Sequence, residues 1–114
     1  MHELSLIANL YEIMEAKAKE QKANKITRVK LQVGVFSGVV PEFLRTAFDI
    51  YKKDTLAAEA VLEIETIPLS IECQSCQAKW ISDQPVFICG TCGSSDIKIL
   101  DGTELILEKM ELAL

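Results

Sequence analysis

Apolar residues at the start of the chain recur every three or four positions, which is the spacing of one face of an α-helix. The pattern predicts an amphipathic helix over residues 3–21. We interpret its apolar stripe as part of the core and not as a partner-binding groove. The residues expected on the buried face are Leu4, Ile7, Ala8, Tyr11, Met14 and Ala18.

A second helix is expected from Pro41 to near Asp54, because proline is favoured in the first turn of a helix. The loop before it contains a serine between two glycines, Ser37, which raises the question of a catalytic nucleophile. With one histidine in the whole chain, a Ser-His-acid arrangement is not expected, and we predict that the protein is not an enzyme. The expected buried face of this helix is Leu44, Ala47, Phe48 and Tyr51.

Three segments have the patterns of β-strands: residues 25–35, 60–67 and 103–112. The first two alternate apolar and polar residues, as half-buried strands do. The third contains the run Leu105-Ile106-Leu107, which is apolar on both faces and typical of a strand covered on both sides. The apolar positions expected to face the core are Val29, Leu31, Val33 and Val35 in the first strand, and Leu62 and Ile64 in the second.

Composition and charge narrow the class of protein. The chain has 114 residues, of which 49% are hydrophobic and 25% charged, which suits one folded core and excludes disorder or a fibrous repeat. Its formal charge of −5 argues against binding nucleic acid through the phosphates. Without an apolar run long enough to span a membrane, or a secretory signal at the start, we expect a cytoplasmic protein that is not embedded in a membrane.

Four cysteines form two C-x-x-C pairs separated by twelve residues: Cys73, Cys76, Cys89 and Cys92. In a reducing compartment such cysteines are more often metal ligands than disulfides. Two facing C-x-x-C knuckles supply four thiolates for tetrahedral zinc. A redox dithiol, disulfides and an iron–sulfur cluster remain as alternatives. Four protein ligands would leave no open position on the zinc, so its predicted role is structural.

The surrounding segment has few residues for a core of its own, namely Trp80, Ile81, Val86, Phe87, Ile88 and some neighbours. A module that small usually needs a staple such as a metal. We expect Gly90 and Gly93 to take the positive φ that the tight turns of the second knuckle require, whereas the first knuckle has no glycine. Zinc on four thiolates would bring the net charge of the chain to about −7, further from that of a nucleic-acid binder.

The only histidine is His2. The simplest interpretation is a solvated terminal side chain. The alternative is that the amino group of Met1, the imidazole of His2 and nearby backbone nitrogens chelate one ion, since nitrogen sets of this kind suit Ni(II) and Cu(II). A helix that starts directly afterwards leaves the first amides without intrahelical acceptors. Glu3 could contribute its backbone nitrogen to such a site, or could complement the helix dipole with its carboxylate.

The order helix, strand, helix, strand, cysteine module, strand predicts an α+β fold. We expect a three-stranded mixed sheet packed with two helices, plus an inserted zinc-ribbon-like module that carries the four cysteines. The expected domains are residues 1–70 with 103–114, and the inserted zinc-binding domain over residues 71–102.

Several segments together resemble one known family. They are Met1-His2-Glu3-Leu4-Ser5-Leu6, Gly34-Val35-Phe36-Ser37-Gly38-Val39 with Pro41-Glu42, the double C-x-x-C, and Gly102-Thr103-Glu104-Leu105. In this order and at this length, they are similar to the HypA/HybF family of nickel-insertion accessory proteins for [NiFe]-hydrogenases. Many relatives carry proline after the third cysteine, where this chain has Gly90, and that difference leaves the ligands untouched.

The resemblance implies a nickel metallochaperone that helps to insert Ni(II) into the hydrogenase large subunit. It implies nickel binding in the domain of residues 1–70 with 103–114, by the imidazole and backbone nitrogen of His2, the amino terminus at Met1 and the backbone nitrogen of Glu3. It implies structural zinc on Cys73, Cys76, Cys89 and Cys92. The implied partners are a nickel-handling accessory GTPase and the hydrogenase large-subunit precursor, with urease maturation proteins in some organisms. The alternative is a zinc-ribbon protein-interaction adaptor with no nickel role.

Overall fold

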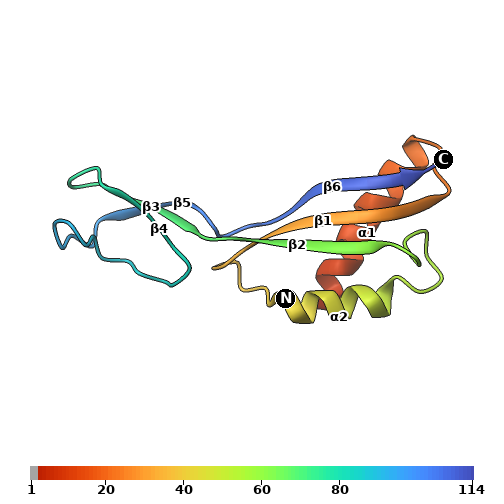
Figure 1. The fold of residues 1–114 in the computed structure, drawn as a ribbon, viewed down its shortest axis with the longest axis horizontal. Coiled ribbons are helices and arrows are strands. Elements are labelled where there is room, and N and C mark those ends of the chain that lie inside the picture. The colour runs from red at the N-terminus through yellow and green to blue at the C-terminus, as the bar shows by residue number, and fades with distance from the viewer. Residues whose placement is uncertain (1–2) are drawn as a thin grey trace.

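The computed structural model describes residues 3–114 and consists of two helices and six strands (Figure 1). No helix within the described range is both long and apolar enough to cross a membrane. The elements in chain order are α1 (Glu3–Glu20), β1 (Lys25–Gly34), α2 (Pro41–Tyr51), β2 (Val61–Ile67), β3 (Leu69–Cys73), β4 (Lys79–Ser82), β5 (Ile97–Asp101) and β6 (Leu105–Ala113).

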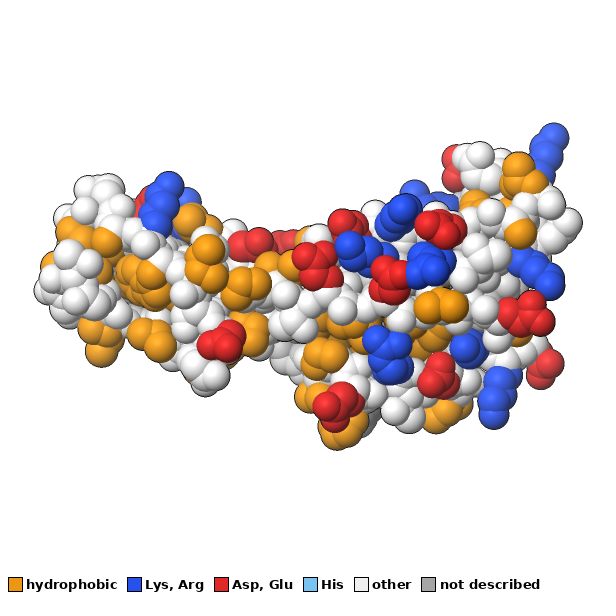
Figure 2. All heavy atoms as spheres, in the orientation of Figure 1, with side chains coloured by type: hydrophobic (Ala, Val, Ile, Leu, Met, Phe, Trp, Pro, Cys, Tyr) orange, Lys and Arg blue, Asp and Glu red, His pale blue; other side chains and the backbone are white. Residues whose placement is uncertain are grey.

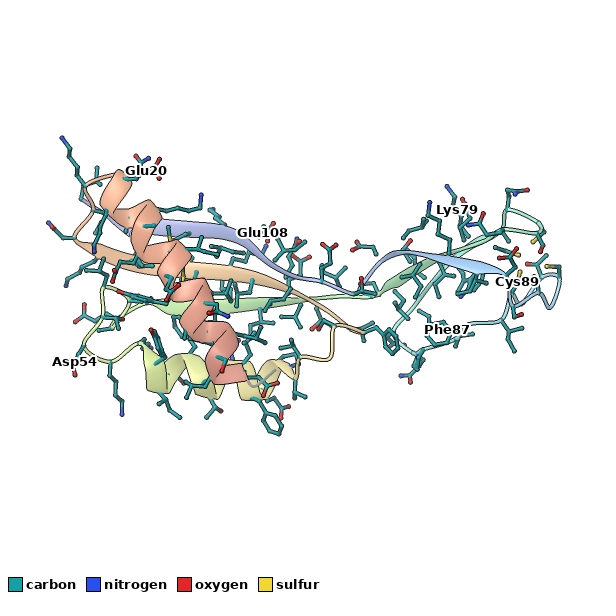
Figure 3. The ribbon with its side chains drawn as sticks, turned by 180° about the vertical axis from the view of Figure 1, so that it is seen from behind. Glu20, Asp54, Lys79, Phe87, Cys89 and Glu108 are labelled. Atoms are coloured by element: carbon teal, nitrogen blue, oxygen red, sulfur yellow. The ribbon has the colours of Figure 1, made fainter. Side chains whose placement is uncertain are left out.

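The larger sheet has the strand order β2-β1-β6, with β1 parallel to β2 and antiparallel to β6. Both helices lie on one face of it, and α1 crosses the strands diagonally (Figures 1 and 3). The predicted three-stranded mixed sheet with two helices is therefore confirmed. The buried core between these layers is apolar and consists of Ile7, Tyr11, Met14, Ala18, Ala23, Ile26, Val29, Leu31, Val33, Leu44, Ala47, Phe48, Ala57, Ala60 and Leu62.

Some residues expected in this core lie outside it. Leu4 is 47% exposed, because the first turn of α1 extends past the sheet towards α2. Val35 is exposed because β1 ends at Gly34, so the alternation does not continue to it. Ile106 is 40% exposed, so the expectation that β6 is covered on both faces is wrong. Within residues 3–114, no helix or strand covers the second face of the sheet.

The second helix is shorter than predicted. It ends at Tyr51, and the amide of the next residue, Lys52, still bonds the Phe48 carbonyl at 2.9 Å. The chain then turns, and Asp54 adopts a left-handed φ of 62°, which continued helix does not allow. The residues of the expected last turn, Lys52 to Asp54, include no apolar side chain that would hold a further helical turn against the core.

The solvent face of the larger sheet is covered with charged side chains of both signs (Figure 2). Lys30 on β1 pairs with Glu65 on β2 and with Glu108 on β6, at 3.5 and 3.3 Å. These pairs are exposed to solvent, so each contributes little to stability. The face is best described as a solvated, nearly neutral surface.

The remaining strands form a smaller sheet in the order β4-β3-β5, at the other end of a molecule that measures 55 × 25 × 18 Å (Figure 1). Its fully buried apolar side chains are Leu69 and Ile71, both on β3. The expected core was wrong, because most of its side chains lie on the surface. Exposed fractions are 72% for Ile81, 60% for Ile88, 45% for Val86 and 37% for Phe87, and Trp80 is half-buried. A lobe with so little apolar core needs another source of stability.

The two sheets meet where β2 runs into β3 and β5 runs into β6. A side chain at Gly34 would collide with the backbone of Gly102 here, and a side chain at Gly102 would collide with the backbone of Pro68 and Leu69. The Phe36 amide donates to the Gly102 carbonyl at 2.9 Å, and the Phe36 ring packs on Phe87 of the smaller lobe with centroids 5.5 Å apart. The junction is therefore held by backbone contacts and one aromatic pair.

Candidate metal centre

The first cysteine knuckle continues directly from β3, which ends at Cys73. The Cys73 amide donates to the Ala78 carbonyl at 2.8 Å, and the Gln77 amide donates to the Cys73 carbonyl at 2.9 Å. Gln77 has a φ of 62°, so a residue other than glycine makes the left-handed turn that follows Cys76. The first knuckle thus closes without a glycine.

The second knuckle has the same plan. The Gly93 amide donates to the Cys89 carbonyl at 2.8 Å, and Gly93 has a φ of 75°. Gly93 follows Cys92 just as Gln77 follows Cys76, so both knuckles turn at equivalent positions. Gly90 has no such φ, and its expected role in the turn was wrong.

The two knuckles bring all four cysteines together at the far end of the smaller lobe (Figure 3). Their sulfur atoms lie within 4.8 Å of one another. The Sγ atoms of Cys73 and Cys92 are 3.6 Å apart, and those of Cys76 and Cys89 are 3.7 Å apart. Four sulfurs at about 2.3 Å from a tetrahedral zinc would be about 3.8 Å apart. The donors therefore match one tetrahedral ion, and their spacing is much larger than a disulfide bond.

Backbone amides favour the thiolate at one cysteine in each knuckle. The amides of Cys92 and Thr91 lower the pKa of Cys89 to about 6. The amide of Cys76 lowers the pKa of Cys73 in the same way. Cys73 and Cys89 are also the two buried members of the cluster, so water contributes little to stabilising their charge.

The other two sulfurs, those of Cys76 and Cys92, have raised pKa values beside these two. At Cys76, the Ala78 amide favours the thiolate, but local desolvation of the sulfur and its contacts with the three neighbouring sulfurs prevail and raise the pKa to about 12. Four negative sulfurs at this spacing repel one another strongly. A bound divalent ion removes that repulsion, since thiols that coordinate a metal are deprotonated outright.

The other predicted metal site involves Met1, His2 and Glu3. Met1 and His2 lie outside the described residues. Glu3 is the first residue of α1 and borders an apolar hollow of about 470 Å³ between the two helices. The hollow is lined by Glu3, Leu4, Phe43, Thr46, Ala47 and Ile50.

Two residues of that hollow, Phe43 and Ile50, were not singled out from the sequence. They are 60% and 59% exposed on the outer side of α2. Their spacing of seven residues, which puts both on one helix face, was the available signal. Ser37 has a structural explanation, because its hydroxyl accepts a hydrogen bond from the Val39 amide at 3.2 Å within the loop before α2.

Comparison with known proteins assigns the chain to a family. The family model described as "Hydrogenase/urease nickel incorporation, metallochaperone, hypA" matches residues 1–112. The chain is 40% identical over 112 residues to the hydrogenase maturation factor HypA of Shewanella oneidensis, covering 98% of this chain and 95% of that protein. It is 37% identical over 112 residues to the factor of the same name from Dehalococcoides mccartyi, covering 98% and 94%.

A solved structure has the same fold. The solution structure of the Ni metallochaperone HypA from Helicobacter pylori matches with a TM-score of 0.71 and 28% identity, covering 99% of this chain and 98% of that one. A second solution structure, of a HypA protein, matches with a TM-score of 0.73 and 28% identity, covering 98% and 96%. The chain therefore belongs to the HypA family of nickel-incorporation metallochaperones.

Proposed function

We propose that this protein carries Ni(II) at its amino terminus and helps to insert it into the hydrogenase large subunit during maturation. The observation that carries the proposal is the family match, which begins at residue 1 and so includes Met1, His2 and Glu3. The proposed ligands are the amino group of Met1, the imidazole and backbone nitrogen of His2 and the backbone nitrogen of Glu3. The proposed domain for this role comprises residues 1–70 with 103–114.

The start of α1 supports this ligand set. Because the described helix begins at Glu3, the amides of its first turn have no carbonyl acceptor within the helix. The positive end of the helix dipole opposes a dication here, so binding depends on amide deprotonation, which supplies anionic nitrogens. An ion held in this way would be released when protons return, which suits a carrier.

We propose that Cys73, Cys76, Cys89 and Cys92 hold structural zinc in a domain over residues 71–102. The tetrahedral spacing of their sulfurs and the sparse core of the lobe support this assignment. With four protein ligands the ion has no open position, so its role is to hold the knuckles together. The protein is proposed to be cytoplasmic and not an enzyme.

The proposed partners are a nickel-handling accessory GTPase and the hydrogenase large-subunit precursor, with urease maturation proteins as further recipients. The family description names both hydrogenase and urease. The alternative function, a zinc-ribbon adaptor with an inert amino terminus, draws support from the exposed apolar side chains of the smaller lobe, such as Ile81 and Ile88.

The test is metal analysis of the untagged, zinc-loaded chain with and without added nickel. We expect one equivalent of Ni(II) beyond the zinc, with the absorption of a nitrogen-rich, square-planar complex. His2→Ala and a one-residue extension before Met1 should each abolish nickel uptake and leave zinc in place. Ser5→Ala is the matched control in the same turn of α1, and it should bind nickel normally.

The pH dependence gives a second readout. Nickel requires a neutral imidazole, so affinity should fall by at least about tenfold between about pH 7.5 and 5.5, across the ordinary histidine pKa near 6.5. A chain that takes up no nickel while keeping its zinc would favour the adaptor. Nickel uptake that persists in His2→Ala, or that displaces zinc from the cysteines, would refute the amino-terminal site.

A further inference from the structure

The outer edge of β6 lacks a partner strand. β6 spans Leu105–Ala113 and pairs only with β1, and no backbone hydrogen bond among the described residues joins its other edge. Figure 1 shows it as the border strand of the larger sheet. A long unpaired edge is a surface on which another strand can add. Its side-chain pattern determines which strand fits.

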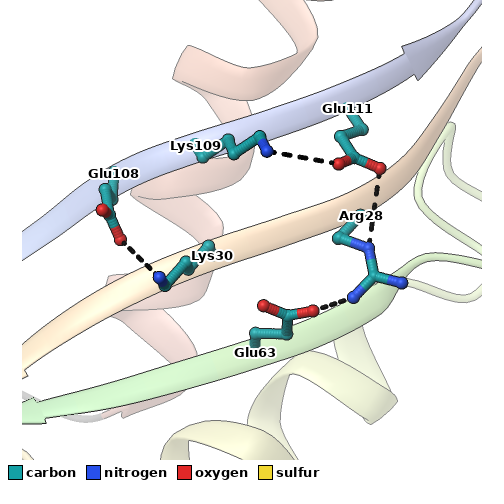
Figure 4. A pocket seen from close by; sticks show the side chains of 6 residues that line it. All are labelled: Arg28, Lys30, Glu63, Glu108, Lys109 and Glu111. Carbon is teal, nitrogen blue, oxygen red and sulfur yellow. Dashed lines mark ion pairs between the residues drawn. The ribbon is translucent and has the colours of Figure 1, made fainter.

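Which side chains face inwards along β6 is set by a bulge. Lys30 lies opposite Lys109 and the next residue, Leu31, lies opposite Leu107, so Glu108 is an extra residue. As a result Glu108 and Lys109 both point to the solvent face, as Figure 4 shows. The side chains that pack against the core from this strand are Leu105, Leu107, Met110 and Leu112.

This order of inward and outward residues is the same in both directions. From the midpoint between Glu108 and Lys109, each half of the strand reads outward, inward, outward, inward. An antiparallel copy about a two-fold axis at that midpoint therefore matches face for face. Leu107 would lie opposite Met110 of the second copy, and Leu105 opposite its Leu112.

The free backbone groups follow the same symmetry. The Glu104 carbonyl accepts a hydrogen bond from the Gly34 amide, and the Glu111 carbonyl accepts one from the Thr27 hydroxyl. The backbone groups of Glu104 and Glu111 therefore face β1. Because successive residues of a strand direct their backbone groups to opposite edges, Leu105, Leu107, Met110 and Leu112 face the free edge. The four residues that pair in the two-fold register are thus the four with available donors and acceptors.

We propose that β6 pairs with the β6 of a second copy of this chain, antiparallel about a two-fold axis between Glu108 and Lys109, to form one continuous sheet. Glu108 of each copy then lies opposite Lys109 of the other on the solvent face, so the dimer contains two contacts between opposite charges. Opposite charges across paired strands stabilise the pairing, and like charges weaken it. A two-fold interface uses the same surface on both copies.

Bulges and lysines are also devices that keep edge strands from pairing. Against a regular strand this bulge has that effect, because pairing past Glu108 would place an inward residue opposite an outward one. Against a second copy the two bulges lie opposite each other and both strands keep the same length. The second copy is therefore the occupant that the edge fits.

The experiment is sedimentation equilibrium on the full, zinc-loaded chain over a wide concentration range. We expect a monomer–dimer equilibrium. In the Lys109→Glu dimer, Glu108 of each copy would lie opposite a glutamate of the other, so both contacts become repulsive. The dissociation constant of the dimer should rise roughly tenfold or more. Glu108→Lys should do the same with two lysines. Lys98→Glu is the matched control, since it makes the same charge change on β5 of the other sheet.

Mixing the two variants separates the interface from a folding defect. A chain with Lys109→Glu and a chain with Glu108→Lys restore opposite charges at both contacts, so the mixture should form a heterodimer as tightly as the wild type. A fold defect in either variant would not be repaired by mixing. In the wild type, the Leu107 and Met110 amides should exchange more slowly as concentration rises.

A wild-type chain that stays monomeric at high concentration would overturn the proposal. So would a Lys109→Glu dimer of unchanged affinity, or a mixture that does not associate. The proposal does not rest on nickel binding, and failure of nickel uptake leaves it intact.

Discussion

The contact between Gly34 and Gly102 makes the sharpest stability prediction, through the substitution Gly34→Ala. A Cβ at Gly34 would overlap the carbonyl of Gly102 and lie 2.8 Å from the Thr103 nitrogen. Ordinary van der Waals contact begins at about 3.5 Å, so the backbone would have to separate by more than about 0.7 Å. Neither side can yield easily, because both are backbone at the junction of the two sheets.

The magnitude follows from the hydrogen bonds at this junction. Gly34 donates to Glu104 at 2.8 Å, and Phe36 donates to Gly102 at 2.9 Å. Separation by the required distance takes both beyond hydrogen-bonding range, which costs about 0.5–1.5 kcal/mol for each. The substitution also stabilises the protein by about 0.4–1 kcal/mol, because alanine has less conformational freedom than glycine in the unfolded chain. The two bonds together cost about 1–3 kcal/mol, so after this gain we expect a net destabilisation of about 1–2 kcal/mol, at the lower end of the range for overpacking.

The assay is equilibrium urea unfolding of the zinc-loaded protein, followed by circular dichroism. Gly90→Ala is the control, because its added Cβ would have no atom within 4 Å and no left-handed φ is involved. It should not lower the free energy of unfolding, and restriction of the unfolded chain should raise it by up to about 1 kcal/mol. Gly38→Ala separates strain from collision, since the space around it is open but its φ is 82°; we expect a loss of about 1 kcal/mol. Equal stability of Gly34→Ala and Gly90→Ala would refute the collision argument.

Three further predictions test other contacts. Tyr11→Phe removes the hydroxyl that accepts a hydrogen bond from the Leu56 amide at 3.0 Å, so thermal unfolding should show a loss of about 1–2 kcal/mol. Burial raises the pKa of Tyr11, so its contribution to stability is complete below about pH 10 and declines as pH rises further; the alkaline loss of stability should be smaller in Tyr11→Phe. Phe87→Ala removes the ring 5.5 Å from Phe36, and nitrogen-15 relaxation should then show the two sheets reorienting more independently; unchanged relaxation would mean that the aromatic pair does not join the lobes. Cys76→Ser should lower zinc content below one equivalent by elemental analysis while the helical signal persists, and full zinc retention would count against the four-sulfur site.

The features that depend on residues close together in the chain were predicted correctly from the sequence alone. The three-and-four spacing of apolar residues located both helices, because a helix exposes one face to the core at that period. The alternation of apolar and polar residues located β1 and β2, because successive side chains of a strand point to opposite faces of the sheet. The spacing of the cysteines predicted their convergence, since a C-x-x-C turn brings two sulfurs to one side and needs no information from distant parts of the chain.

Predictions failed where a residue's environment depends on distant segments. Burial of Leu4 and Ile106 depends on which layer covers them, and neither periodicity nor composition reports a missing layer. The smaller lobe was expected to bury Ile81 and Ile88, but its strands place Ile71 inside instead. With the proposed metal on its four sulfurs, this lobe does not depend mainly on an apolar core for stability, so apolar residues can remain outside.

The sequence by itself determined the helices, the alternating strands, the cysteine cluster and the family resemblance, because each of these depends on residues close together in the chain or on a fixed motif. Only the tertiary structure decided the close contact of Gly34 with Gly102, the packing of Phe36 on Phe87, and the bulge that turns both Glu108 and Lys109 to the solvent face. Each of these arises where segments far apart in the chain meet. Their geometry is set by the register and crossing of whole strands, which no local pattern of residues specifies.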